Sequence, residues 1–149
     1  MTVRINAVRF IVAALAYTVF AYLLHLIGAL LTIPFYLDPA YFPVWSKFLM
    51  PTAGPPPLSF SLYSLILGFV AALLFVYIYL RVRPLFKGGS RARRGATYGF
   101  GVFLVGGLPG FFMLWLLINI PFFLIVYFAV EGLIVNVAGG ILVAYLMQE

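Results

Sequence analysis

The sequence contains no cysteine, and His25 is the single histidine among its 149 residues. Without thiols, the chain itself cannot form disulfides, thiolate metal sites, iron–sulfur clusters, c-type haem attachments or a cysteine nucleophile. One imidazole is also too few for a zinc site or a bis-histidine haem unless several subunits share ligands. We therefore expect no cofactor and no metal.

Charged residues are scarce as well. They make up 8% of the chain, with three acidic and nine basic residues, whereas 66% of the residues are hydrophobic. An ordinary soluble domain has about 25% charged residues, and a soluble protein of this size could not bury so much apolar surface. The expected fold class is therefore an all-α integral membrane protein with one domain, residues 1–149.

Four apolar runs are each long enough to cross a hydrocarbon core of about 30 Å at about 1.5 Å per residue. We expect them to form a four-transmembrane-helix bundle. Pro34 is expected to end the first helix, and Asn119-Ile120-Pro121 is expected to form a tight turn between the last two. The expected spans are residues 10–33, 58–80, 95–118 and 121–146.

The connection over residues 34–57 holds seven of the ten prolines, so it cannot be helical throughout. Its aromatic rings favour the level of the lipid headgroups, and a short interfacial helix is possible between Tyr41 and Met50. Two interpretations stay open: an aromatic belt that anchors the bundle, or a lid over a cavity between the helices. The rings belong to Phe35, Tyr36, Tyr41, Phe42, Trp45 and Phe48.

A basic loop, residues 81–94, predicts the orientation. Together with Arg4 and Arg9 it carries eight of the nine basic residues, and only Lys47 lies elsewhere. The positive-inside rule then places both termini in the cytoplasm. The net charge of +6 forms no separate basic module, so we expect anionic lipid, or an acidic soluble partner, and no nucleic acid. The residues expected to contact lipid headgroups are Arg81, Arg83, Lys87, Arg91, Arg93 and Arg94.

Each span carries a stripe of small or polar residues at spacings of three and four. Close backbone approach and polar contacts drive helix association in lipid, so these stripes predict the packing faces. Pro109 is expected to kink or loosen the third span. The stripes are Ala14, Thr18, Ala21, His25, Gly28 and Thr32; Ser61, Ser64, Gly68 and Ala71 or Ala72; Gly95, Gly99, Gly106 and Gly110; and Gly132, Asn136, Gly140 and Ala144.

Glu131 is the acidic residue within a span, and His25 lies at a similar depth. His25 is about 12 Å and Glu131 about 15 Å from the outer surface, by helical rise. A lone charge there costs a few kcal/mol, so we expect the two to meet directly or through one water. Further hydrogen bonds to this candidate polar site are expected from Tyr22, Ser64, Thr18 and Asn136.

Two functions fit these features. Packing stripes on every span favour a structural or accessory subunit of a membrane assembly, joined to other membrane subunits or to copies of itself. The alternative is a small transporter or channel with a proton- or cation-responsive site at Glu131 and His25. A pin that only fixes helix register and a ligand or pigment site are further interpretations of that pair.

An enzyme is not expected, because the sequence has no paired-carboxylate, G-x-S-x-G or H-E-x-x-H motif. The layout is similar to that of many small four-helix membrane proteins of bacteria and archaea. That resemblance favours a multi-pass protein of a prokaryotic inner or plasma membrane.

Overall fold

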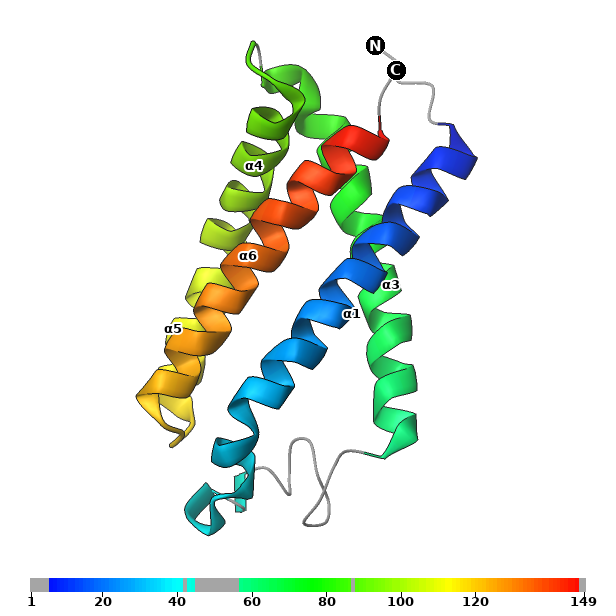
Figure 1. The fold of residues 1–149 in the computed structure, drawn as a ribbon. Coiled ribbons are helices and arrows are strands. Elements are labelled where there is room, and N and C mark those ends of the chain that lie inside the picture. The colour runs from blue at the N-terminus through cyan, green and yellow to red at the C-terminus, as the bar shows by residue number, and fades with distance from the viewer. Residues whose placement is uncertain (1–5, 42, 45–56, 87, 148–149) are drawn as a thin grey trace.

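The computed structural model describes residues 6–41, 43–44, 57–86 and 88–147, and these form helices and turns without strands. Four membrane-length segments follow one another along the chain (Figure 1). The elements are α1 (Ala7–Leu37), η1 (Pro39–Tyr41), α3 (Leu58–Val82), η2 (Arg83–Leu85), α4 (Arg91–Val102), η3 (Phe103–Gly107), α5 (Leu108–Leu117) and α6 (Phe122–Leu146).

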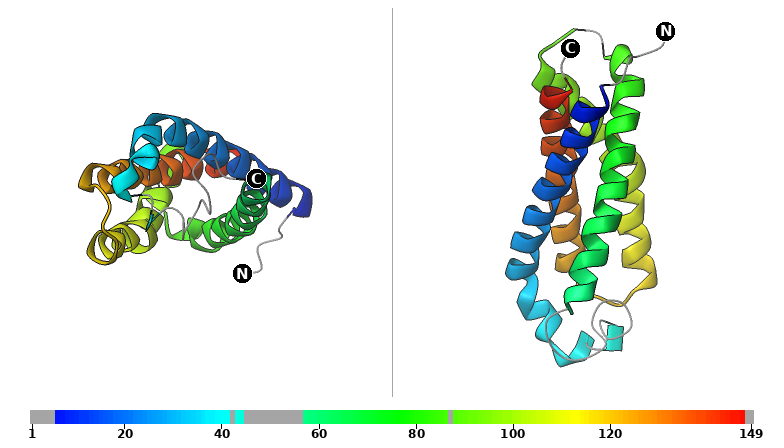
Figure 2. Two further views of the ribbon diagram at one scale, coloured as in Figure 1. Left: turned by 90° about the horizontal axis from the view of Figure 1, so that it is seen from below. Right: turned by 90° about the vertical axis from the view of Figure 1, so that its right-hand side faces the viewer.

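The described chain has four helical segments long and apolar enough to cross a membrane, as the sequence predicts. The start of α1, the end of α3, the start of α4 and the end of α6 lie together, and we call this the basic end (Figure 1). The turn between α5 and α6 lies with the end of α1 at the opposite, aromatic end. The views of Figure 2 show the segments lying side by side along one long axis, with successive segments running in opposite senses. Which end faces the cytoplasm stays a prediction.

The first helix does not end at Pro34, and that prediction is wrong. Helix α1 continues through Pro34 to Leu37, where Asp38 follows in an extended conformation. Proline is tolerated within membrane helices when neighbouring groups satisfy the backbone that it frees. The carbonyl that Pro34 leaves without its helical donor is that of Leu30, whereas the Thr32 hydroxyl donates to the carbonyl of Gly28 at 2.8 Å.

The basic loop is shorter than predicted. Helix α3 extends to Val82 and continues as the single turn η2, and α4 begins at Arg91. Ser90 is the N-cap of α4, and its hydroxyl accepts a hydrogen bond from the backbone N–H of Arg93 at 3.2 Å. Such a cap satisfies one of the N–H groups that a helix start leaves unpaired. Gly88 and Gly89, both with positive φ, make the turn before it.

The disturbance expected near Pro109 takes the form of a π-helical turn, η3. Pro109 has no N–H to donate, and just before it the N–H of Leu108 bonds back to the carbonyl of Phe103, five residues earlier. The π-turn contains one residue more than a turn of α-helix. The residues after it are therefore rotated by about 100° about the helix axis, relative to their positions in a regular α-helix. This rotation decides which faces of α5 meet α6.

The packed core lies in the half of the bundle toward the basic end. Its centre is aromatic. The Tyr17 and Phe75 rings stack with their centroids 4.5 Å apart, and the Phe75 and Tyr98 rings form an edge-to-face pair with their centroids 4.7 Å apart. The Tyr98 hydroxyl donates to the carbonyl of Phe75 at 2.6 Å and joins α4 to α3. Around it, the buried residues include Ala13, Ala14, Ala72, Val76, Tyr79, Leu80, Val135, Val143 and Ala144.

Helices α4 and α6 approach most closely in this half. A Cβ added at Gly95 would lie 2.7 Å from the Cα of Ile141, and one added at Gly99 would lie 2.6 Å from the carbonyl carbon of Asn136. Real side chains do not fit at these distances. The two glycines therefore allow backbone-to-backbone contact, which is a strong form of helix association in lipid.

The half toward the aromatic end is open by comparison. The buried residues of α3 all lie between Ala72 and Leu80, and α5 has none. The buried cluster there is small: Ile120, Leu124 and Ile125, with partly buried neighbours that include Phe35 and Tyr41. The predicted interfacial helix from Tyr41 to Met50, with Phe42, Trp45, Lys47 and Phe48, lies for the most part outside the described residues.

Candidate functional site

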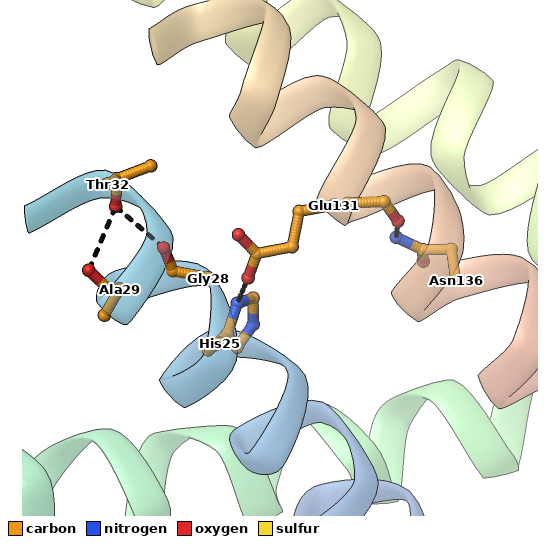
Figure 3. Close-up of polar contacts among 7 residues, drawn as sticks. His25, Gly28, Ala29, Thr32, Glu131 and Asn136 are labelled. Carbon is orange, nitrogen blue, oxygen red and sulfur yellow. Dashed lines mark hydrogen bonds and ion pairs between the residues drawn. The ribbon is translucent and has the colours of Figure 1, made fainter.

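Glu131 of α6 and His25 of α1 are in direct contact in the middle of the bundle. The Nδ1 atom of His25 is paired with Oε1 of Glu131 (Figure 3). Figure 3 shows the Glu131 side chain reaching across from α6 toward α1. The depths computed from helical rise therefore identified two residues that are 106 positions apart in the chain and touch in the fold.

Gly28 makes room for this contact. A Cβ added at Gly28 would lie 2.8 Å from Cδ of Glu131, so the carboxylate rests on bare backbone of α1. The sequence placed Gly28 in a packing stripe, and the structure shows that the group packed on it is the carboxylate itself. Gly28 is buried, and it follows His25 by three residues, which puts both on neighbouring parts of one helix face.

Two hydroxyl-bearing residues near the pair were missed by the sequence analysis. Tyr127 of α6 lies one turn before Glu131, and Tyr36 of α1 is within hydrogen-bonding reach of Thr32. Helical spacing could have found them, because Tyr127 precedes Glu131 by one turn and Tyr36 follows His25 by three turns.

The four other residues predicted for the site do not bond to the pair. The Asn136 amide donates to the carbonyl of Gly132 in its own helix at 2.8 Å, and the Thr18 hydroxyl donates to the carbonyl of Ala14 at 2.8 Å. Tyr22 and Ser64 are partly buried and, within the described part of the chain, give the pair no hydrogen bond. Polar side chains in membrane helices often bond to the carbonyl one turn earlier, and Asn136 and Thr18 follow this pattern.

The charge state of the pair follows a simple rule. The ionised form, imidazolium with carboxylate, and the neutral form, imidazole with carboxylic acid, both carry no net charge. An unpaired charge in hydrocarbon is unfavourable. Transfer of a proton between the two partners leaves the net charge of the pair at zero, so neither form places an unpaired charge in the span. The contact can therefore hold a proton within the membrane, or pin α1 to α6.

The pair is unevenly covered. The Glu131 side chain is 12% exposed, whereas the His25 side chain is 61% exposed. Nδ1 of His25 is used by Glu131, and the ring has a second nitrogen, Nε2, which also donates or accepts hydrogen bonds. At this depth an imidazole that contacted only lipid tails would be unfavourable.

One predicted stripe is split by the π-turn. The sequence placed Gly95, Gly99, Gly106 and Gly110 on one face, but only the first two face α6. Beyond η3 the rotation brings Phe111 to that face, where its ring lies 3.1 Å from a Cβ added at Gly132. A Cβ at Gly101, Gly106 or Gly110 would meet no atom within 4 Å.

The predicted lipid-contacting residues lie at or beside the basic end, except that Lys87 falls outside the described residues. Arg81 bonds to the Tyr77 hydroxyl at 3.1 Å, and Arg83 donates to the carbonyl of Met147 at 3.2 Å. Arg91 and Arg93 are exposed, and Arg94 is partly buried. The described residues include no group of three histidine, cysteine, aspartate or glutamate side chains placed to hold a metal ion.

No protein-family model, curated protein or solved structure matches this chain. The site must therefore be interpreted from its own geometry.

Proposed function

We propose that this chain is a small structural or accessory subunit of a membrane assembly, joined to other membrane subunits or to copies of itself. The observation that supports this is the contrast in packing along the bundle. Toward the basic end the helices bury one another, whereas α5 and the first part of α3 bury none of their own residues.

Apolar exposure alone is normal for a membrane protein, because lipid tails are as apolar as leucine. Exposed glycines and an exposed imidazole are different. Gly101, Gly106 and Gly110 leave bare backbone that only a closely packed helix covers well. His25 offers a polar atom at a depth where water is scarce. Both features favour a second protein surface against this half of the bundle.

The test is a mass measurement of the protein extracted gently into nanodiscs or a mild detergent. We expect a homo-oligomer or a reproducible co-purifying membrane partner. Gly110→Leu fills the open stripe and is expected to weaken that association, while Ala71→Leu, on an exposed position of α3 beside the packed half, is the matched control. A lone monomer under all conditions would contradict the assembly role.

The alternative function is a small transporter or channel that uses Glu131 and His25. The specific observation in its favour is that two ionisable side chains are paired between helices that are long and apolar enough to span a membrane. We expect proton or cation flux in proteoliposomes that falls at least tenfold in Glu131→Gln. Flux that Glu131→Gln leaves unchanged across a range of pH would exclude this function.

A further inference from the structure

His25 is exposed on a face of α1 that is buried before and after it. Thr18 and Thr32 lie two turns before and two turns after His25, so the three residues share one face of the helix. Thr18 is 8% and Thr32 is 2% exposed, whereas the His25 side chain is 61% exposed. The helix packing is therefore interrupted at His25, and we call this interruption the His25 gap.

Helix α3 lies across the His25 gap from α1. A Cβ added at Gly68 of α3 would lie 3.9 Å from Cγ2 of Thr18, which fixes the register of these two antiparallel helices. Ser61 precedes Gly68 by seven residues and His25 follows Thr18 by seven, so the two lie at one level, about 10 Å closer to the aromatic end. Ser61 and Ser64 are partly buried on the face that Gly68 turns toward α1. Figures 1 and 2 show α1 and α3 separating in that direction.

The pair with Glu131 determines whether the second ring nitrogen of His25 carries hydrogen. Nδ1 is occupied by the Glu131 carboxyl group. In the ionised pair, the imidazolium carries hydrogen on both nitrogens, and in the neutral pair the carboxylic acid donates to Nδ1, so the ring hydrogen is on Nε2. A neutral ring beside a carboxylate would place a net charge in hydrocarbon. Nε2 is therefore a hydrogen-bond donor in both forms without net charge, and it has no lone pair for a metal ion.

The depth of the His25 gap limits the source of the acceptor for this donor. The phosphates and ester carbonyls of lipids lie at the headgroup level, whereas His25 is about 12 Å from the end of the apolar run at Ile33. A molecule that fills the gap must be apolar enough to enter the hydrocarbon and must carry an acceptor oxygen with it. The hydroxyls of Ser61 and Ser64 are further donors on the facing helix. A flat ring with carbonyl oxygens on two opposite edges matches donors on two facing helices.

We propose that the His25 gap binds the ring of an isoprenoid quinone. One carbonyl of the quinone accepts a hydrogen bond from Nε2 of His25, the other accepts one from Ser61 or Ser64, and the apolar tail lies among the lipid tails. Glu131 is a positioning residue, because it holds the imidazole and keeps hydrogen on Nε2. The expectation of no cofactor came from counts of metal ligands, and a quinone requires none. This site is independent of the assembly role proposed above.

The donor can be tested directly, because His25 is the single histidine of the chain. In tag-free protein with ¹⁵N-labelled histidine, a two-dimensional ¹⁵N–¹H spectrum of the ring at neutral pH reports on both nitrogens of one residue. We expect hydrogen on Nε2. An Nε2 atom without hydrogen would overturn the proposal.

Binding is measured by native mass spectrometry of the protein in detergent micelles that contain decylubiquinone. We expect the wild type to retain one quinone per chain. The double variant His25→Phe/Glu131→Leu removes both partners and leaves no unpaired charge, and we expect its retention to fall about tenfold. Ser61→Ala/Ser64→Ala keeps the pair intact and is expected to lower retention about fivefold.

Tyr63→Phe is the matched control. It removes a hydroxyl from α3 at a position that is 65% exposed and does not share the face of Ser61 and Ser64, so we expect it to retain the quinone like the wild type. Equal losses in Tyr63→Phe and the serine variant, or retention that no variant changes, would overturn the site. If the wild type retains no quinone although Nε2 carries hydrogen, the acceptor belongs to a neighbouring subunit and the quinone is excluded.

Discussion

The two halves of this bundle are built from equally apolar helices but are held together differently. Toward the basic end, Gly95 and Gly99 bring two backbones into contact and an aromatic cluster fills the space between α1, α3 and α4. Toward the aromatic end, α5 buries none of its own residues, and Gly106 and Gly110 face open space. Apolar character alone therefore does not bring membrane helices into close contact. Small residues do so only where the rotation of the helix turns them toward a neighbouring helix.

The largest expected effect comes from the backbone contact in the packed half. Gly99→Ala places a methyl group where the backbone of Asn136 and Val137 lies, so α4 and α6 must move apart. We expect the free energy of unfolding to fall by about 3 kcal/mol, measured by denaturation in mixed micelles. A loss below that of Tyr98→Phe would contradict the close approach.

The next effect concerns the polar bond between α4 and α3. Tyr98→Phe keeps the ring and its packing but removes the hydroxyl that donates to Phe75. We expect a loss of about 1 kcal/mol in the free energy of unfolding. Tyr145→Phe, at a ring that is 46% exposed, is the control and should leave stability unchanged; similar losses in both variants would remove the special role of Tyr98.

A smaller effect is expected for the pair between the halves. In a double-mutant cycle of His25→Ala and Glu131→Ala, the coupling should be about 0.6 kcal/mol, the average measured for polar contacts between membrane helices. Additive losses would show that the contact contributes nothing to stability. The packed half would then hold α1 and α6 together without it.

The smallest effect is expected on the face of α4 that points away from α6. Gly101→Ala adds a methyl group where no atom lies within 4 Å, so the stability of the monomer should change by less than about 0.5 kcal/mol. The comparison with Gly99→Ala uses the same chemical change two residues away. A loss as large as that of Gly99→Ala would mean that another part of the chain covers this face of α4.

The number of spans and the meeting of His25 with Glu131 follow from the sequence, because long apolar runs and a fixed rise per residue determine depth. The hydrogen bonds of Asn136 and Thr18 were not predictable in this way. Each side chain bonds to a carbonyl of its own helix, because that carbonyl is always within reach. The position of a partner on another helix depends on the packing of the whole bundle.

The third span shows a second limit of sequence patterns. Counting by 3.6 residues per turn places Gly106 and Gly110 beside Gly95 and Gly99, and this holds only for an uninterrupted α-helix. The π-turn at Phe103–Gly107 adds one residue to the count, and its formation depends on local backbone energetics near Pro109 that hydrophobic periodicity does not contain. At Pro34 the error is the opposite one: the sequence predicts an interruption, but α1 continues through Pro34 to Leu37.

The π-turn also sets the rotation of α5 about its own axis. If the turn relaxed to a regular α-helix, α5 would revolve by about 100° about its own axis, bringing Gly106 and Gly110 against α6 and swinging Phe111 away from it. The tip of the molecule would become slimmer on one side and bulkier on the other without any change in the packed half. The one extra residue in the π-turn therefore determines which face of α5 meets α6.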